Sequence, residues 1–111
     1  MHDLINRRCS NNPEQAPKLN SDETLALQPL ISADWLLDTD AQAITRKIGF
    51  KNYYQTMAFA NSVAWIVQQE DHHPDMTITY RHCQLCFTTH SVAGLSVNDF
   101  ICAAKIDALL V

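Results

Sequence analysis

A long amphipathic segment between Asn52 and Pro74 most constrains how this chain of 111 residues can fold. Its apolar residues recur at intervals of four, three, four and three, which is the spacing of one face of an α-helix. A second apolar stripe runs beside the first, and a helix that is apolar on two sides must bury both. We expect the second side to meet another subunit or to lie under the first or last helix. The first stripe comprises Tyr53, Met57, Ala60, Ala64 and Val67, and the second comprises Phe59, Val63 and Ile66, with Trp65 beside it.

Shorter segments with strand and helix character flank the long helix on both sides. Runs rich in apolar, β-branched and aromatic residues predict one hairpin before it and another after it. A first helix has acidic residues in its first turn, and a last amphipathic helix closes the chain. This order predicts an α+β fold in which helices pack on one face of a four-stranded antiparallel sheet. The expected helices run from Asn20 to Pro29, from Asn52 to Pro74 and over 98–110, and the expected strands over 33–38, 42–50, 76–80 and 82–89.

Composition and charge favour one globular domain with no nucleic-acid or membrane partner. Apolar residues make up 47% and charged residues 18% of the chain, which is typical of a folded domain. The net charge is −4, whereas binding phosphates needs clustered lysine and arginine. No apolar run approaches the ~20 residues of a membrane span, and the first residues lack the apolar centre of a signal peptide, so we expect a cytoplasmic protein. Residues 1–19 contain two prolines and few apolar residues, which predicts a flexible arm before a single domain over 20–111.

Cys83 and Cys86 have the spacing of a zinc or redox motif, but their surroundings argue against both functions. The stretch "YRHCQLCFTT" is rich in β-branched and aromatic residues and predicts a strand. Side chains of a strand alternate between faces, so two residues three apart point to opposite sides. No second pair with metal-ligand spacing accompanies them, and we expect no metal site.

Two adjacent histidines, His72 and His73, lie at the end of the long helix. Side chains of neighbouring helix residues point ~100° apart, so these imidazoles are poorly placed to bind one metal ion together. A cationic pair that caps the helix and a proton-transfer site both fit this spacing. His90 follows the last strand, so that in a short hairpin it comes close to Pro74. The sequence therefore predicts that His72, His73 and His90 meet around one cleft.

Asp99 and Trp35 each fit a structural and a functional role, and the structural role is favoured for both. Ser96 and Asp99 have the spacing of a capping box, in which the carboxylate accepts the backbone N–H of Ser96. A strand tryptophan is more often a core residue than the wall of a site. His82, in the middle of a strand, is expected to face solvent or a neighbouring strand.

The stretch "EDHHPDMTITY…CFTTHSVAGLSVNDFICAAKID" resembles the pterin-4a-carbinolamine dehydratase family. Trp35 and the segment 48–64 also resemble the strand-to-helix region of that family, and the likeness covers about residues 20–110. The matching motifs are Asp-His-His-Pro at 71–74, Tyr80, Thr-Thr-His at 88–90, and Ala-Gly-Leu-Ser with the following aspartate at 93–99.

The resemblance implies an α+β fold that assembles as homodimers or homotetramers. It implies dehydration of 4a-hydroxytetrahydropterin to quinonoid dihydropterin, the recycling step after aromatic amino-acid hydroxylation, with no metal or organic cofactor. The implied catalytic residues are His72, His73 and His90, with His72 and His90 as the acid/base pair and His73 mainly binding the pterin. The residues implied to line or orient the pocket by hydrogen bonding are Asp71, Thr88, Thr89 and Ser91.

Gln68 departs from some members of the family, which carry a glutamate one helical turn before His72. A neutral amide there removes a negative charge that favours a protonated imidazole nearby. This departure bears on the rate and the pH dependence more than on the reaction. The alternative function is a protein-interaction or dimerisation module of the same fold with weak catalysis, because animal members also serve as dimerisation cofactors of a homeodomain transcription factor.

Overall fold

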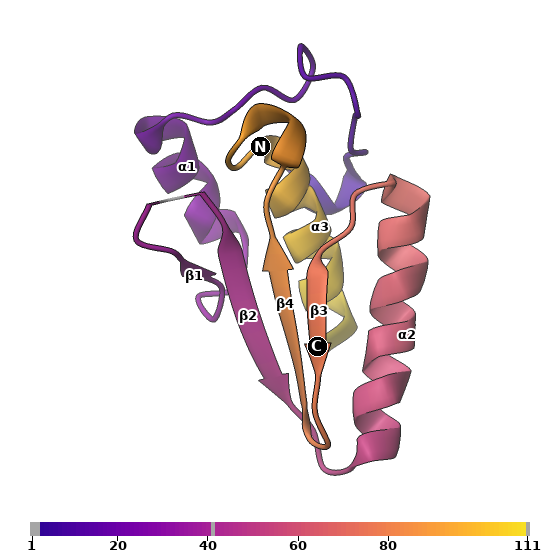
Figure 1. The fold of residues 1–111 in the computed structure, drawn as a ribbon. Coiled ribbons are helices and arrows are strands. Elements are labelled where there is room, and N and C mark those ends of the chain that lie inside the picture. Colours follow the sequence, from indigo (N-terminus) through magenta and orange to yellow (C-terminus); the bar gives the residue numbers. More distant parts are fainter. Residues whose placement is uncertain (1–2, 41, 111) are drawn as a thin grey trace.

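The computed structural model describes residues 3–40 and 42–110, so the ends of the predicted arm and of the predicted domain lie outside the described residues. In this part of the chain, a four-stranded antiparallel sheet has the order β1–β2–β4–β3 (Figure 1). Helices pack on one face of the sheet, which confirms the predicted α+β fold. The strands are β1 (Leu36–Leu37), β2 (Ile44–Gly49), β3 (Asp75–Ile78) and β4 (His82–Phe87); the α-helices are α1 (Ser21–Leu27), α2 (Tyr53–Glu70) and α3 (Val97–Asp107); the short 3-10 helices are η1 (Leu4–Asn6), η2 (Gln28–Leu30), η3 (His90–Val92) and η4 (Ala108–Leu110).

Strand β4 lies inside the sheet and supplies much of its core face. Cys83, Leu85 and Phe87 are fully buried, whereas the residues between them are partly exposed, as the alternation of a strand requires. Strand β2 pairs with β4 so that Ile44, also buried, lies opposite Phe87. The prediction that Cys83 and Cys86 point to opposite faces of strand β4 is confirmed, since Cys83 is buried and Cys86 is partly exposed.

Helix α2 buries one side against the sheet and α3. The second predicted stripe faces the core, since Phe59 and Val63 are buried and Ile66 packs against them. The first stripe is buried only in part, since Ala60 and Val67 are buried whereas Tyr53 and Ala64 are exposed, so the first and last helices do not cover this side completely. Burial of the remaining side by another subunit stays a prediction. The exposed residues on this side include Tyr53, Tyr54, Ala64 and Trp65, of which Tyr54 is 81% and Trp65 is 67% exposed.

Helix α2 ends at Glu70, earlier than the expected stop at Pro74. Asp71 has a φ of 53°, in the left-handed region, and its N–H bonds to carbonyls of the last helical turn. A residue in this conformation ends a helix, and aspartate adopts it more readily than most residues other than glycine. His72 and His73 therefore lie beyond the helix, on the path from α2 to β3. The backbone N–H of His72 still bonds the carbonyl of Val67 at 3.2 Å, but the imidazoles contact the side chains of Asp99 and Gln68.

The first hairpin is confirmed, but its first strand is shorter than the predicted 33–38. Strand β1 has two residues, because Ser32 begins a turn in which its carbonyl accepts the N–H of Trp35. Trp35 thus lies before the strand, and its ring packs on Phe87 with the centroids 5.9 Å apart. Its indole N–H donates to Asp107 at 2.7 Å. The core position favoured for Trp35 is confirmed, since the residue is 5% exposed.

The N-terminal segment packs on the body of the protein, although its composition predicts a flexible arm. Figure 1 shows this indigo segment running from the region of α3 to α1, and Leu4 in η1 is 3% exposed. The buried carboxylate of Glu70 accepts the N–H of Cys9 at 2.8 Å and lies 3.1 Å from the guanidinium of Arg8. Lys105 of α3 contacts the same carboxylate at 2.6 Å. The segment has the contacts of a packed element, while the domain boundary at residue 20 stays a prediction.

Replacing Glu70 by glutamine is expected to lower the free energy of unfolding by about 1–3 kcal/mol at neutral pH, because charge-assisted hydrogen bonds are lost. Burial opposes ionisation of Glu70, but the hydrogen bonds from Lys105 and the Cys9 N–H, with the charges of Lys105 and Arg8, hold its pKa below the ordinary value of 4.5. A carboxylate with a lowered pKa stabilises the fold above its unfolded pKa, and this contribution disappears as the pH falls through the folded pKa.

Urea unfolding of both proteins at several pH values measures this effect of Glu70. The difference in stability should be largest at neutral pH and should shrink as the solution is made more acidic than the folded pKa. A difference that stays constant down to about pH 2 would contradict the assignment, because the carboxylate would then contribute nothing through its charge.

Candidate active site

A cavity of about 380 Å³ opens where β3 begins and β4 ends. Asp75 at the start of β3 pairs with Cys86 near the end of β4, so the segments beyond these two strand ends lie side by side. All the residues that the resemblance implies for substrate binding meet here, and the N-terminal segment closes the cavity on another side. The lining residues are Asp71, His72, His73, Thr88, Thr89, His90 and Ser91, together with Ser10, Asn11, Pro13, Ala16 and Asn98.

His72 pairs with the buried carboxylate of Asp99. Its Nε2 lies 2.6 Å from Oδ1 of Asp99, which is fully buried, and its ring stacks on Phe87 with the planes 17° apart. Because the carboxylate accepts, Nε2 carries a proton and the lone pair of the neutral imidazole is on Nδ1. The pair therefore fixes the tautomer of His72 and stabilises the imidazolium that forms when Nδ1 takes up a proton.

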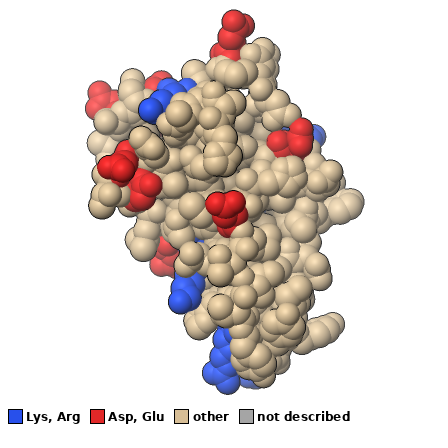
Figure 2. Space-filling view, in the orientation of Figure 1, with Lys and Arg blue, Asp and Glu red and all other residues tan. Residues whose placement is uncertain are grey.

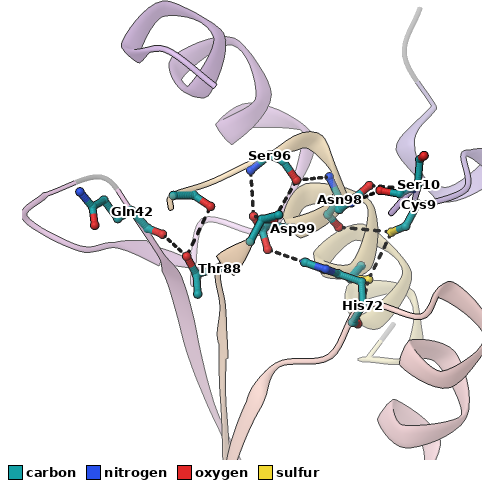
Figure 3. Close-up of polar contacts among 11 residues, drawn as sticks. Cys9, Ser10, Gln42, His72, Thr88, Ser96, Asn98 and Asp99 are labelled. Carbon is teal, nitrogen blue, oxygen red and sulfur yellow. Dashed lines mark hydrogen bonds and ion pairs between the residues drawn. The ribbon is translucent and has the colours of Figure 1, made fainter. Parts of the chain in front are cut away.

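The other oxygen of Asp99 is held by Ser96, the residue before α3 (Figure 3), and by Thr89, which follows β4. Oδ2 accepts the N–H of Ser96 at 2.9 Å and the hydroxyl of Thr89 at 2.8 Å. The Ser96 hydroxyl lies 2.8 Å from the Thr89 oxygen and donates to it, since the Thr89 proton is committed to Asp99. The predicted capping box of Ser96 and Asp99 is confirmed, and the same carboxylate also orients His72.

His73 and His90 lie nearer to solvent than His72. Nε2 of His73 is 3.2 Å from the side-chain oxygen of Gln68, in the last turns of α2. The amide oxygen accepts, so this nitrogen carries a proton and Nδ1 of His73 is left as an acceptor. His90 is exposed in η3, where the chain turns away from β4. The cavity thus combines one half-buried imidazole, which is hydrogen-bonded to a carboxylate, with two exposed ones.

Thr88 and Thr89 use their hydroxyl groups to hold the rim of the cavity. Thr88 donates to the carbonyl of Gln42 at 2.6 Å, which ties the rim to the loop before β2 (Figure 3). The backbone of Thr89 pairs with Gly94 and so closes the turn over 90–93 that carries His90 and Ser91. Thr89 therefore positions other groups, and its own hydroxyl is committed to Asp99.

No cysteine is among the residues that line this cavity in the described part of the chain, and two of the cysteines are protected from ionisation. The hydrogen bond with Cys9, followed by burial, raises the pKa of Cys102 far above its ordinary range, and burial raises the pKa of Cys83. A raised pKa keeps a thiol protonated and unreactive. Within residues 3–40 and 42–110, no group of three or more histidine, cysteine, aspartate or glutamate side chains is arranged to hold a metal ion.

Two residues considered in the sequence lie away from the cavity. Trp35 is in the core beside Phe87. His82 begins β4 opposite Gly49 and is exposed, near the far end of the hairpin from His90. Neither side chain lines the cavity.

Sequence reasoning missed the wall that the N-terminal segment builds. Ser10 and Asn11 line the cavity, and buried Asn98 holds them by bonding the backbone of Ser10. The pair Asn11-Asn12 before Pro13 carries the signal of a turn, but nothing local shows where such a turn packs. Nothing in the sequence around Asn98 indicates that it holds Ser10, apart from its position next to Asp99 in a capped first helical turn.

The surface gives no sign of a nucleic-acid site on the face drawn in Figure 2. Lysine and arginine side chains occur there as small separate groups among acidic and uncharged ones. A phosphate-binding surface needs a continuous basic patch. Across the described part of the chain, no helix is both long enough and apolar enough to span a membrane.

Comparison with known proteins adds the family to this geometry. The family model described as pterin 4 alpha carbinolamine dehydratase matches residues 17–109. This chain belongs to the pterin-4a-carbinolamine dehydratase family. The matched range includes every histidine that lines the cavity, Asp99, and the turn over 90–93.

Curated relatives in the pterin-4a-carbinolamine dehydratase family match almost the whole chain. A protein from Nitrosomonas eutropha is 49% identical over 109 residues, which are 98% of this chain and 95% of the relative. A protein from Legionella pneumophila (strain Corby) is 45% identical over 109 residues, with 98% and 96% covered. Both are named pterin-4-alpha-carbinolamine dehydratase as a provisional assignment. The matches extend into the N-terminal segment that lines the cavity.

Solved structures agree with the fold of the pterin-4a-carbinolamine dehydratase family. The transcriptional coactivator/pterin dehydratase from Brucella melitensis has a TM-score of 0.77 at 26% identity, covering 83% of this chain and 97% of that one. A pterin dehydratase-like RuBisCO assembly factor of the α-carboxysome has a TM-score of 0.59 at 19% identity, covering 68% and 88%. The second likeness concerns the fold alone.

Proposed function

We propose that this chain is a hydro-lyase that converts a 4a-hydroxytetrahydropterin (a pterin-4a-carbinolamine) to quinonoid dihydropterin and water. The observation that carries the proposal is the pair of His72 with the buried carboxylate of Asp99, at a cavity that His73 and His90 also line. Family membership supplies the substrate class, and imidazoles exchange protons near neutral pH. The reaction needs no metal or organic cofactor, and it would recycle the pterin used by aromatic amino-acid hydroxylases.

The chemistry requires one acid and one base. The bond between C4a and its hydroxyl oxygen breaks as the oxygen takes a proton and leaves as water, while N5 loses its proton and forms a double bond to C4a. We assign the base to Nδ1 of His72, because Asp99 stabilises the imidazolium that results. We assign the acid to His90, whose exposed ring can be reprotonated from solvent.

The remaining cavity residues would bind and orient the pterin. Nδ1 of His73 is an acceptor for a ring N–H, because Gln68 holds the proton on the other nitrogen. Asp71 can accept a hydrogen bond from an amino group, and Ser91 and Thr88 offer hydroxyl oxygens at the rim. Binding by several such groups would hold C4a and N5 near the acid and the base.

Stopped-flow ultraviolet absorbance tests the proposed reaction directly. The carbinolamine is generated by a pterin-dependent hydroxylase, and its decay is followed with and without this protein. We expect the decay rate to rise in proportion to the protein concentration, and to return to the spontaneous rate when His72 and His90 are both replaced by alanine. Decay at the spontaneous rate in the presence of the unaltered, folded protein would contradict the proposal.

Replacing Gln68 by glutamate is expected to move the acid side of the pH–rate profile to higher pH. The new carboxylate favours a protonated His73, and protonation removes the Nδ1 acceptor that binds the pterin. The profile of kcat/KM against pH measures the change. The matched control is Gln69→Glu, which adds the same charge on the next residue of α2; a Gln68→Glu profile that coincides with the unaltered one would refute the role of this contact.

The alternative is an interaction or dimerisation module of the same fold with weak catalysis. Tyr54 and Trp65 on the outer side of α2 are largely exposed, which supports contact with another protein surface.

We propose that this side joins copies of the chain into a homodimer or homotetramer. Light scattering measures the assembly, and Trp65→Ala should weaken it; a monomer at working concentrations would refute it. A folded assembly that does not accelerate dehydration would favour the alternative.

A further inference from the structure

The N-terminal segment forms a wall of the cavity although it is distant from the histidines in the sequence. Ser10, Asn11, Pro13 and Ala16 line the same cavity as His72. None of these four side chains titrates near neutral pH, so they cannot carry a proton in the reaction. Their groups can form hydrogen bonds and define shape, which are the properties that set ligand specificity. The wall is therefore suited to selecting a substrate.

Successive residues of this wall are anchored to the body of the protein. Asn98, which is 2% exposed, accepts the N–H of Ser10 at 3.1 Å and donates its amide to the carbonyl of Ser10 at 2.8 Å (Figure 3). The side-chain amide of Asn11 donates to Asp71 at 2.7 Å, and the N–H of Cys9 is held by Glu70. A surface segment with these contacts presents its side chains in a fixed geometry.

The same turn of α3 positions both the wall and the proposed base. Asn98 fixes Ser10, and its neighbour Asp99 fixes His72. The distance between the wall and the reacting atoms is thus set by one rigid element. A substrate group that reaches the wall would locate the ring relative to His72.

We propose that the wall binds the substituent carried by the pterin ring, with Asn11 as the specificity-determining residue, and that it selects a hydroxylated substituent over a plain alkyl one. The inference rests on the proposed dehydratase function. One N–H of the Asn11 amide serves Asp71, and the group also has a second N–H and a carbonyl oxygen. Such an amide recognises hydroxyl groups as both donors and acceptors, whereas an alkyl group offers it no hydrogen bond.

The test compares two carbinolamines that differ in the ring substituent, one bearing a dihydroxypropyl group and the other a methyl group. The unaltered protein should prefer the hydroxylated substrate in kcat/KM. Asn11→Ala should raise KM for that substrate about ten-fold, as expected when one or two hydrogen bonds are lost, and should change KM for the methyl substrate less than about two-fold. The kcat for both substrates should stay within about two-fold, because the acid and base are untouched.

Two further variants separate selection from general damage. Asn98 is assigned no contact with the substrate, but Asn98→Ala removes the hydrogen bonds that hold Ser10. This variant should therefore reduce the preference for the hydroxylated substrate, as Asn11→Ala does. Glu14→Ala is the matched control, because Glu14 belongs to the same segment, is exposed and does not line the cavity. Its preference should equal that of the unaltered protein.

The outcomes distinguish this inference from the function on which it rests. Failure of the unaltered protein to accelerate decay of either carbinolamine would overturn both. Two outcomes would overturn only the proposed role of the wall and leave the dehydratase function standing. One is that the unaltered protein accelerates decay of both carbinolamines with equal kcat/KM, and the other is that the Asn11→Ala variant keeps the original preference. A drop in kcat for both substrates in Asn11→Ala would also overturn it, since the residue would then act on the chemistry.

Discussion

Replacing His72 by alanine is expected to slow dehydration of a 4a-hydroxytetrahydropterin at least 10²-fold, which is about the smallest effect of removing a general acid or base. His72 is the one imidazole of the cavity, among the described residues, that pairs with a buried carboxylate, at 2.6 Å from Asp99. His90→Ala should cause a loss of the same order if it is the acid. His73→Ala should raise KM more than it lowers kcat, since it is assigned to binding. Single-turnover stopped-flow measurements separate these effects.

The control for the histidine variants is His82→Ala. His82 is exposed at the start of β4 and does not line the cavity, so its replacement should leave kcat and KM unchanged. Circular dichroism and urea unfolding verify that each variant is folded. Unchanged rates in a folded His72→Ala or His90→Ala protein would overturn the role assigned to that residue, whatever happens to the other.

Replacing Asp99 by alanine is expected to lower the free energy of unfolding by about 3–5 kcal/mol, the usual cost of removing one partner of a buried pair. The carboxylate is fully buried and accepts from His72, Thr89 and the N–H of Ser96. Alanine leaves these donors unpaired, and each buried unpaired donor costs about 1–3 kcal/mol before relaxation. Urea unfolding monitored by tryptophan fluorescence measures the loss.

Asp99→Asn separates the positioning role from the structural one. The amide keeps the size of the carboxylate and can still accept from His72 or from the capping N–H, but it does not stabilise an imidazolium by charge. We expect the asparagine variant to lose less stability than the alanine variant while its kcat falls at least about ten-fold. Asp75→Ala is the control, because this residue is exposed on β3 and should change stability by less than about 0.5 kcal/mol. An Asp99→Asn protein with unaltered kcat would refute the positioning role, and Asp99 would then act only as a helix-capping residue.

Local patterns predicted most of the fold, because helices, strands and caps depend on neighbours a few residues apart. The alternation of a strand predicted that Cys83 and Cys86 point to opposite faces of β4, and the spacing of Ser96 and Asp99 predicted the start of α3. The same kind of reasoning placed the end of α2 too late. It used the proline at 74, whereas the left-handed conformation of Asp71 had already ended the helix.

Contacts across the chain could not be predicted in this way. The Nε2–Oδ1 contact of His72 with Asp99 and the clamp of Asn98 on Ser10 join residues from separate elements. A periodic pattern tells which face of an element is apolar, and it does not tell which polar side chains meet. The composition of residues 1–19 indicated few core contacts, whereas in the folded chain Glu70, Asn98 and Asp71 all form hydrogen bonds with this segment.

The sequence by itself determined the α+β arrangement, the family resemblance and the set of imidazoles at 72, 73 and 90, because these follow from spacing and residue type. The tertiary structure decided how the imidazoles differ. It gives His72 a buried carboxylate, His73 the amide of Gln68, and His90 an exposed position. It also brings the N-terminal segment to the cavity as a wall. The physical reason is that the tautomer of an imidazole and its readiness to take up a proton depend on its partners, and the folded chain alone sets those partners.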